Sequence, residues 1–346
     1  MKILVTGAAG FIGFYVAKML VTKGHTVVGL DNINDYYDVN LKYARLKELG
    51  ISKPDAEIEN TLANSSTHPR FSFVRIALED RVALPKLFKD QKFDVVCNLA
   101  AQAGVRYSLE NPEAYIDSNV VGFLNVLECC RNHGIEHLVY ASSSSVYGLN
   151  KKVPFETADR TDSPISLYAA TKKSNELMAH TYSHLYGFPC TGLRFFTVYG
   201  PWGRPDMAYF SFTEAILANK PITVYNQGNL SRDFTYIDDI VTGISRIIEK
   251  GFKPNSGSSG KASIYNIGRG QPVPLLEFIN TMGKELKKEV KLELLPMQDG
   301  DVYTTWAHTG ELQKNYGYAP KVNLDEGVRT FINWYIKYNK ISLIAQ

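Results

Sequence analysis

A glycine-rich loop between a short apolar run and a helical pattern restricts the fold of this chain more than any other feature. The loop reads Gly7-Ala8-Ala9-Gly10-Phe11-Ile12-Gly13 and directly follows the run Ile3–Val5. Gly7 permits a tight turn, Gly10 lets the backbone approach a phosphate, and Gly13 lets the helix pack closely on the strand. The free N–H groups and the positive dipole end of the helix favour a pyrophosphate there. The loop therefore predicts a dinucleotide site, against the alternative of a purely structural strand-to-helix turn.

Asp31 follows the second apolar run, Thr26–Leu30, at the spacing expected for a ribose-binding acid. A carboxylate there accepts hydrogen bonds from the adenosine 2′- and 3′-hydroxyls and repels a 2′-phosphate. The residue thus favours NAD over NADP as the cofactor. Taken alone, Asp31–Asp35 is also compatible with an ordinary strand-terminating turn.

Alternation of apolar runs with amphipathic helical patterns predicts the fold class. Continuous apolar runs are typical of parallel strands that helices cover on both faces. The predicted strands are Ile3–Val5, Thr26–Leu30, Phe71–Ile76, Val95–Ala100, Leu138–Ala141 and Thr191–Phe195. The predicted helices are Phe11–Lys23, Leu41–Gly50, Arg81–Lys89, Asn119–Asn132 and Leu167–Tyr186. We expect an α/β protein with a Rossmann-like, doubly wound parallel sheet.

The length of 346 residues suits about two domains. We expect residues 1–190 to form the NAD-binding domain and residues 191–346 to form a smaller, mixed α/β substrate-binding lobe, interleaved with the last strands of the sheet. Within the first domain, Ser52–Arg70 is polar and rich in Pro, Asn, Ser and Thr, which predicts a surface insertion. Asn255–Gly260 has the composition of a flexible loop.

Composition excludes several classes of protein. Lys and Arg number 38 against 35 Asp and Glu, a net charge of +3, which argues against a nucleic-acid binder with its dense basic stripe. The four cysteines show no Cys-x-x-Cys spacing, and His180 and His184 resemble only half a metal site, so we expect no metal. No apolar stretch approaches the ~18 residues of a membrane span, and the first apolar run is too short for a signal peptide. We expect a cytoplasmic protein with reduced thiols and no membrane partner.

Tyr168 and Lys172 lie one helical turn apart at the start of the predicted helix Leu167–Tyr186, and therefore on one face. An unperturbed phenol has a pKa of ~10, and a neighbouring ammonium favours the phenolate. Such a pair is often only an exposed helical face, but here it follows the serine-rich strand end Ser142–Ser145. Hydroxyls at the carboxyl end of a central strand project into the region where sheets of this kind bind ligands. The two features together predict a catalytic site.

The motifs resemble those of the extended short-chain dehydrogenases/reductases of the nucleotide-sugar epimerase group, within the NAD-dependent epimerase/dehydratase family. The resemblance covers nearly the whole chain and is closest to the UDP-glucuronate 4-epimerases. Besides the motifs above, three longer strings carry it: Asn98–Arg106, Arg194–Pro205 and Arg232–Asp239.

This resemblance implies a catalytic set and two binding sets. Ser143, Tyr168 and Lys172 match the catalytic residues: Ser143 holds the sugar 4-hydroxyl and Tyr168 takes its proton, while the C4 hydride passes to NAD and returns to the other face of a transient 4-keto sugar. The residues implied for the cofactor are Gly7, Gly10, Phe11, Ile12, Gly13, Asp31, Asn32, Leu99, Ala100, Ala101, Asn119, Tyr168 and Lys172. Arg232 matches the residue that neutralises the UDP phosphates.

Three positions depart from the pattern of the group. Asn98 stands where many relatives have His, and Ala77-Leu78 stands where they have an acid that contacts adenine. The segment Gln298–Val302 lacks an arginine that some epimerases use for phosphate, so nucleotide binding is expected to rely on Arg232 with Arg204 or Arg269.

The serine run and Thr197 favour one sugar. Related dehydratases carry an Asp-Glu pair and related decarboxylases a Glu at the positions of Ser144 and Ser145, whereas Thr197 stands where hexose epimerases have Asn. Ser144, Ser145 and Thr197, with Arg204 nearby, form a candidate cradle for a C6 carboxylate, and a polar cradle discourages decarboxylation of the β-keto acid. The predicted activity is the interconversion of UDP-glucuronate and UDP-galacturonate. The alternatives are a UDP-glucose/UDP-galactose 4-epimerase and, more remotely, a non-catalytic NAD-binding protein. By analogy with the group we expect a homodimer, formed through the helices that bear Asn119–Cys130 and Leu167–Tyr186.

Overall fold

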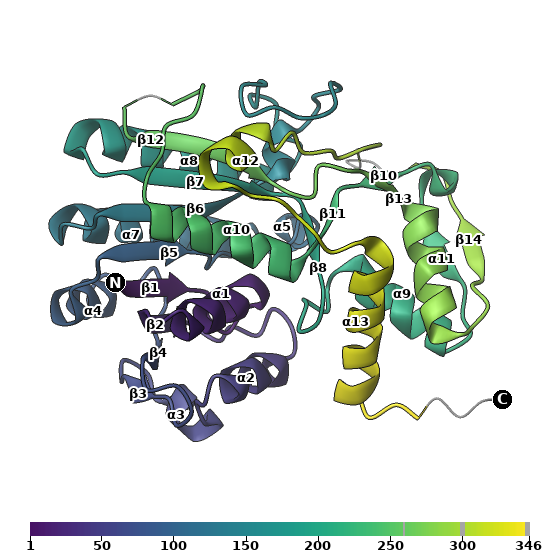
Figure 1. Cartoon of the computed structure of the whole chain (residues 1–346), viewed down its shortest axis with the longest axis horizontal. Coiled ribbons are helices and arrows are strands. Elements are labelled where there is room, and N and C mark those ends of the chain that lie inside the picture. Colours follow the sequence, from purple (N-terminus) through teal and green to yellow (C-terminus); the bar gives the residue numbers. More distant parts are fainter. Residues whose placement is uncertain (259, 298–301, 343–346) are drawn as a thin grey trace.

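The computed structural model describes residues 1–258, 260–297 and 302–342, arranged around one eight-stranded sheet (Figure 1). Its strand order is β12-β7-β6-β5-β1-β2-β4-β3, and every neighbouring pair is parallel except β3 with β4. The strands are β1 (Lys2–Thr6), β2 (Thr26–Asp31), β3 (Ala63–Asn64), β4 (Phe71–Arg75), β5 (Val95–Asn98), β6 (His137–Ser143), β7 (Cys190–Phe195) and β12 (Ala262–Ile267). The chain order reverses between β1 and β5, which is the position where doubly wound sheets bind ligands. The predicted fold class is therefore confirmed.

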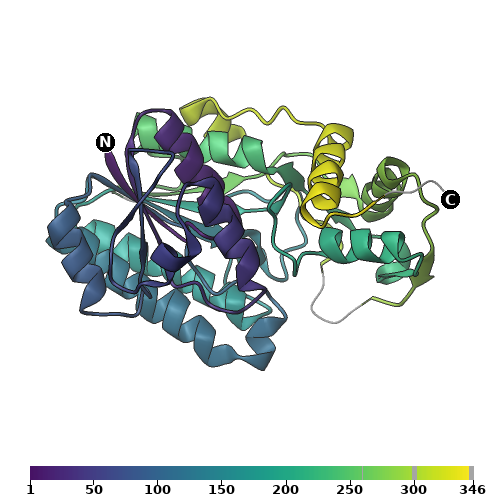
Figure 2. The ribbon, with the colours of Figure 1, turned by 90° about the horizontal axis from the view of Figure 1, so that it is seen from below.

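Helices cover both faces of the sheet, as Figure 2 shows. One face carries α1 (Phe11–Thr22), α10 (Ile237–Lys250) and α12 (Gly310–Tyr316), and the other carries α4 (Ala83–Gln91), α7 (Gly122–Asn132) and α8 (Leu167–Tyr186). Alternate residues of β1 pack against opposite faces of the sheet. Ile3 and Val5 pack in the cluster with α1 and α10, whereas Leu4 packs in the cluster with α4 and α7. Burial on both faces explains why the strands read as continuous apolar runs.

Short elements connect or extend this framework. Those in the first half are α2 (Val39–Glu48), α3 (Lys53–Glu57), α5 (Tyr107–Glu110), α6 (Pro112–Tyr115), the π-helix η1 (Ile116–Val121) and the 3-10 helix η2 (Ser144–Tyr147). The predicted helix Asn119–Asn132 thus starts as a π-helix and continues as α7. The insertion 52–70 is not irregular throughout, because it contains α3 and adds β3 to the edge of the sheet.

The second half returns to the sheet and also builds a smaller lobe. This lobe contains β8 (Thr197–Tyr199), α9 (Ala208–Leu217), β9 (Ile222–Val224), the 3-10 helix η3 (Asn226–Gly228), β10 (Ser231–Arg232), β11 (Phe234–Tyr236), β13 (Val273–Pro274), α11 (Leu275–Leu286), β14 (Leu292–Leu294) and α13 (Leu324–Tyr338). β7 and β12, from the same half of the chain, belong to the main sheet. In the described part of the chain, no helix is long and apolar enough to cross a membrane.

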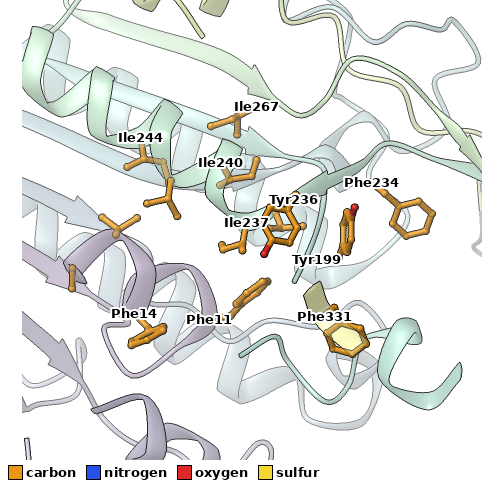
Figure 3. Close-up of a cluster of buried hydrophobic side chains, with 14 of the residues drawn as sticks. Phe11, Phe14, Tyr199, Phe234, Tyr236, Ile237, Ile240, Ile244, Ile267 and Phe331 are labelled. Atoms are coloured by element: carbon orange, nitrogen blue, oxygen red, sulfur yellow. The ribbon is translucent and has the colours of Figure 1, made fainter. Parts of the chain in front are cut away.

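One hydrophobic cluster joins the lobe to the sheet. Figure 3 shows Phe11 and Phe14 of α1 beside Ile237 and Ile240 of α10, with Tyr199 and Phe234 farther into the lobe. The rings of Phe234 and Phe278 stack with their centroids 4.0 Å apart. This continuous packing fixes the lobe against the edge of the sheet where the strands end.

Candidate active site

The glycine loop leaves no space for larger side chains, as the sequence predicts. Gly7 has a φ of +71°, and a Cβ on it would lie 2.9 Å from the backbone nitrogen of Ala100. A Cβ on Gly13 would lie 2.1 Å from the Gly7 carbonyl oxygen, so this position also requires glycine. Gly10 precedes α1 and offers no side-chain cap to the first turn of the helix. The first N–H groups of α1, from Phe11 and Ile12 onward, therefore suit the pyrophosphate of a dinucleotide.

Thr6, which the sequence patterns did not single out, holds the end of β5 and the residues after it against the glycine loop. Its hydroxyl donates to Asn98 Oδ1 at 2.7 Å and accepts from the N–H groups of Leu99 and Ala100 at 3.1 and 3.0 Å. Leu99–Ala101 consequently leaves β5 next to the glycine loop, where a contact under a cofactor was expected. The departure at Asn98 is accommodated, since its amide pairs with Thr6.

Asp31 ends β2 with its carboxylate held in place. Its oxygens accept from the N–H groups of Ala9 at 3.2 Å and Ile33 at 2.8 Å, and the Lys42 ammonium lies 3.7 Å away. A carboxylate has about four acceptor positions, so capacity remains for two ribose hydroxyls. Asn32 follows it, with a backbone carbonyl that accepts from Arg75 at 3.2 Å. The residues therefore fit an adenosine ribose, and Lys42 is a neighbour that the sequence pattern did not reveal.

Tyr168 and Lys172 lie on the first turns of α8, which Ser166 caps by accepting from the Ala169 N–H at 3.1 Å. The Lys172 ammonium donates to the Ala141 carbonyl at 3.0 Å, at the end of β6, and burial lowers its pKa to about 8. It lies 6.0 Å from the centroid of the Tyr168 ring. The structure therefore places the predicted pair together, with Lys172 fixed by the strand.

Burial raises the pKa of the Tyr168 phenol, and two neighbours oppose that effect: the Arg204 guanidinium and the Ser143 hydroxyl. Arg204 is thus a second cation near the phenol, in addition to Lys172, while the Asp206 carboxylate raises the pKa of the phenol. Ser143 ends β6, and its Oγ lies 2.5 Å from Ser145 Oγ. Ser144 follows at the start of η2, so the three hydroxyl residues begin at the carboxyl edge of the strand.

Arg204 is itself tightly held. Its Nε and Nη2 donate to the two carboxylate oxygens of Asp206 at 3.0 and 2.6 Å. The Tyr36 hydroxyl donates to the same carboxylate at 3.1 Å, which links Arg204 to the segment after Asp31. Neither Tyr36 nor Asp206 carried a sequence signal, because the contact joins residues 170 positions apart.

A buried ion pair is hydrogen-bonded to the serine run Ser142–Ser145. Glu176 of α8 and Arg194 of β7 form two hydrogen bonds of 2.8 and 2.9 Å, and both side chains are almost fully buried. Ser142 donates to Glu176 at 2.6 Å, directly before the candidate catalytic Ser143. Arg194 holds the pKa of the Glu176 carboxyl below its usual value, against the opposing effect of burial. This network fixes the end of β6 relative to α8.

Asn119 has a structural partner for each amide atom. Its Oδ1 accepts from the Gln102 N–H at 2.8 Å, and its Nδ2 donates to the Gln102 carbonyl at 3.0 Å and to Thr171 at 3.1 Å. The residue was expected as a cofactor-side contact; here it joins the segment after β5 to α8.

Arg232 lies on β10 in the lobe, where it donates to the Ser231 carbonyl at 2.9 Å. The adjacent Asp233 is completely buried and accepts from the N–H groups of Arg269, Gly270 and Ala307 at 2.7, 2.9 and 3.0 Å. The Thr197 N–H donates to the Asp233 carbonyl at 3.1 Å, which ties Thr197 to the strand of Arg232. Of the segment that lacks the family arginine, Gln298–Asp301 lies outside the described residues.

Other candidates stay outside this region. The rings of His180 and His184 lie parallel on α8 with centroids 6.5 Å apart, and no cluster of three potential metal ligands occurs among the residues described. All four cysteines are buried and unpaired.

The fold and the site residues are those of one protein family. Residues 3–268 match the NAD dependent epimerase/dehydratase family, so the chain belongs to that family.

Several known proteins are similar to this chain along nearly its whole length. The chain is 52% identical to Protein CapI of Staphylococcus aureus over 98% of this chain and 100% of the relative. It is 47% identical to a probable UDP-glucuronate 4-epimerase of Rhizobium meliloti, over 97% of each chain. Among solved structures it resembles the UDP-glucuronic acid 4-epimerase of Bacillus cereus in complex with UDP-glucuronic acid and NAD, with a TM-score of 0.84, 31% identity, and 98% and 100% of the two chains covered.

Proposed function

We propose that this chain is an NAD-dependent isomerase that interconverts UDP-glucuronate and UDP-galacturonate by inversion at C4. The observation that carries the proposal is the meeting of Tyr168, Ser143 and Arg204 beside the strand ends that hold the glycine loop and Asp31. The kinship with UDP-glucuronate 4-epimerases supports the same reaction.

Each residue has a chemical role in this proposal. Ser143 orients the sugar 4-hydroxyl by a hydrogen bond, and the Tyr168 phenolate removes its proton as C4 is oxidised. NAD, when bound, would supply the hydride acceptor for C4 and later the hydride donor. The 4-keto sugar would turn over in the site between these two steps, so that the hydride returns to its other face. Tyr168 would then return the proton to the C4 oxygen. Lys172, held by the Ala141 carbonyl, is positioned to bind the nicotinamide ribose.

Arg204 stabilises the phenolate electrostatically. A guanidinium stays charged throughout the pH range in which proteins fold. Lys172, whose pKa burial lowers to about 8, is still mostly protonated at neutral pH. Both cations therefore favour the phenolate before substrate binds, and the positive charge of the oxidised cofactor adds to them.

The C6 carboxylate is assigned to Ser144, Ser145 and Thr197. Hydroxyl donors hold a carboxylate by charge-assisted hydrogen bonds without adding a carboxylate that would act in elimination or decarboxylation. Arg232, which lies on β10 of the lobe next to the buried Asp233, is assigned to the diphosphate. Substrate would then bridge the lobe and the sheet.

The test offers the purified protein UDP-glucuronate, UDP-glucose and UDP-xylose separately and identifies products by NMR. Epimerisation of UDP-glucuronate is the expected result. Rapid epimerisation of UDP-glucose with UDP-glucuronate left unchanged would replace this proposal with a UDP-hexose epimerase, and turnover of none would indicate a non-catalytic NAD-binding protein.

Thr197→Val is expected to lower kcat/KM for UDP-glucuronate by roughly 10- to 100-fold, because a hydrogen bond to a charged group contributes about 1.5–3 kcal/mol. Any neutral UDP-hexose turnover should change little, and release of CO2 should rise. The matched control is Thr213→Val, a buried threonine of α9 whose hydroxyl donates to the Tyr209 carbonyl at 2.7 Å. Equal losses with both sugars would remove Thr197 from the carboxylate cradle.

The homodimer is proposed from the outer surface of α8. Leu177, Leu185 and Tyr186 expose 57%, 61% and 42% of their surface there, which is unusual for large apolar side chains. Pairing through α7 and α8 would bury them, and sedimentation that detects only monomer at working concentration would contradict it. Buried, unpaired cysteines support a reducing compartment and hence a cytoplasmic location.

A further inference from the structure

Arg45 of α2 is a completely buried cation whose five hydrogen bonds run to oxygen atoms of separate segments. Its Nη1 donates to the Ala9 carbonyl at 2.9 Å and to the Tyr37 hydroxyl at 2.7 Å. Its Nε and Nη2 donate to the Trp202 carbonyl at 3.0 and 2.7 Å, and Nη2 also donates to the Gly203 carbonyl at 2.9 Å. A buried charge is tolerated only when its hydrogen-bonding capacity is met, so these segments are held around the guanidinium.

The segments that Arg45 joins belong to the two halves of the site. Ala9 lies within the glycine loop, and Trp202-Gly203 directly precedes Arg204. One side chain thus connects the phosphate loop to the backbone of the arginine beside Tyr168.

Other contacts from the sheet side hold the same loop. The Tyr15 hydroxyl of α1 donates to the Pro201 carbonyl at 3.1 Å, and the Trp202 ring packs 5.9 Å from that of Phe14. Trp202 has a φ of +58°, in the left-handed region that a bulky residue adopts only when its surroundings impose it. The contacts of Pro201 and Trp202 therefore fix the backbone of this loop and, with it, the position of Arg204.

The side chain of Arg204 is held from the same stretch of sequence. Asp206 binds its guanidinium in a bidentate pair, and Tyr36 donates to Asp206. Tyr36, Tyr37 and Arg45 all follow Asp31 within fifteen residues, so the stretch that leaves the ribose site also fixes both ends of Arg204.

We propose that Arg45 is a positioning residue that couples the cofactor loop to Arg204 and thereby sets the reactivity of Tyr168 toward the sugar. The inference rests on the proposed function for its substrate. Arg45→Lys keeps the charge but replaces five donors in a planar fork with three on one nitrogen, so it cannot hold Ala9, Trp202 and Gly203 together.

The test is a double-mutant cycle on the purified, NAD-loaded protein, with kcat/KM for UDP-glucuronate measured against pH. Arg45→Lys is expected to lower kcat/KM about 10-fold in the wild-type background and less than about 2-fold in the Arg204→Gln background, because neighbours that act through one another are not additive. The pH at which activity rises should move upward in Arg45→Lys, since a displaced Arg204 no longer lowers the pKa of Tyr168.

Two further variants keep the test decisive. Tyr316→Phe removes a buried hydroxyl of α12 that accepts from the Lys253 N–H at 2.9 Å, and it should shift neither the pH profile nor the cycle. If Arg45→Lys fails to fold, Tyr37→Phe removes one acceptor of Arg45 and should show the same non-additivity with a roughly 3-fold effect. Equal losses in both backgrounds, or a pH profile that does not move, would overturn only the inference about Arg45. Wild-type protein that turns over no UDP-sugar would overturn the proposed function.

Discussion

Tyr168→Phe is expected to reduce turnover of UDP-glucuronate by about 10²- to 10⁴-fold, because proton transfer by a positioned base contributes that much to the rate. Phe keeps the ring and removes only the hydroxyl that takes the proton. Bound NAD should remain, since the glycine loop and Asp31 do not depend on the phenol. The measurements are the rate of product formation by NMR and the cofactor content of the purified variant.

Tyr265→Phe provides the matched control. Tyr265 is a fully buried tyrosine of β12 whose hydroxyl donates to the Lys253 carbonyl at 2.9 Å, outside the catalytic set. Its loss should affect stability more than turnover. Full activity in Tyr168→Phe would remove Tyr168 from its assigned role.

Arg194→Met is expected to lower the free energy of unfolding by about 3–5 kcal/mol, because it removes both hydrogen bonds of the buried partner and leaves Glu176 only the more exposed Lys173 ammonium, 3.5 Å away. The double variant Arg194→Met/Glu176→Leu should recover most of this loss, since an apolar pair of similar size leaves no buried charge. Denaturant unfolding of the NAD-loaded proteins measures both. The exposed pair Lys86–Asp90 is the control, and Lys86→Met should change the free energy of unfolding by less than ~1 kcal/mol.

The pH dependence of this pair has a definite sign. The pKa of Glu176 is lower in the folded protein, so its contribution is present above the ordinary Glu pKa of ~4.3 and is lost as the pH falls from there through the folded value. The stability difference between the wild type and Arg194→Met should therefore narrow in acid. A double variant no more stable than Arg194→Met would contradict the electrostatic explanation.

Local patterns predicted the parts of the fold that depend on neighbouring residues. The helix Leu167–Tyr186 has the predicted bounds, and the glycine loop follows β1 as expected. These features succeed because apolar periodicity and glycine spacing act within one or two elements. The helix α3 and strand β3 within residues 52–70 were missed, since polar composition hides short elements that pair with a neighbouring strand.

Contacts distant in sequence account for what was not predicted at the site. Lys172 lies near Tyr168, as its spacing predicted, but the second cation that lowers the pKa of the phenol, Arg204, belongs to a loop beyond β8 and had no local signal. Arg45 showed no signal because all but one of its hydrogen bonds run to backbone carbonyl oxygens, which every residue possesses. The roles of Ser144, Ser145 and Thr197 toward a carboxylate stay predictions, and Thr197→Val tests the last of them.

The central claim is that one hydride leaves C4 and returns to it within the same site. UDP-glucuronate that carries deuterium at C4 tests this directly, with the product followed by NMR in ordinary water. The account predicts UDP-galacturonate that retains deuterium at C4. Replacement of that deuterium by solvent hydrogen, or inversion at another carbon, would contradict it.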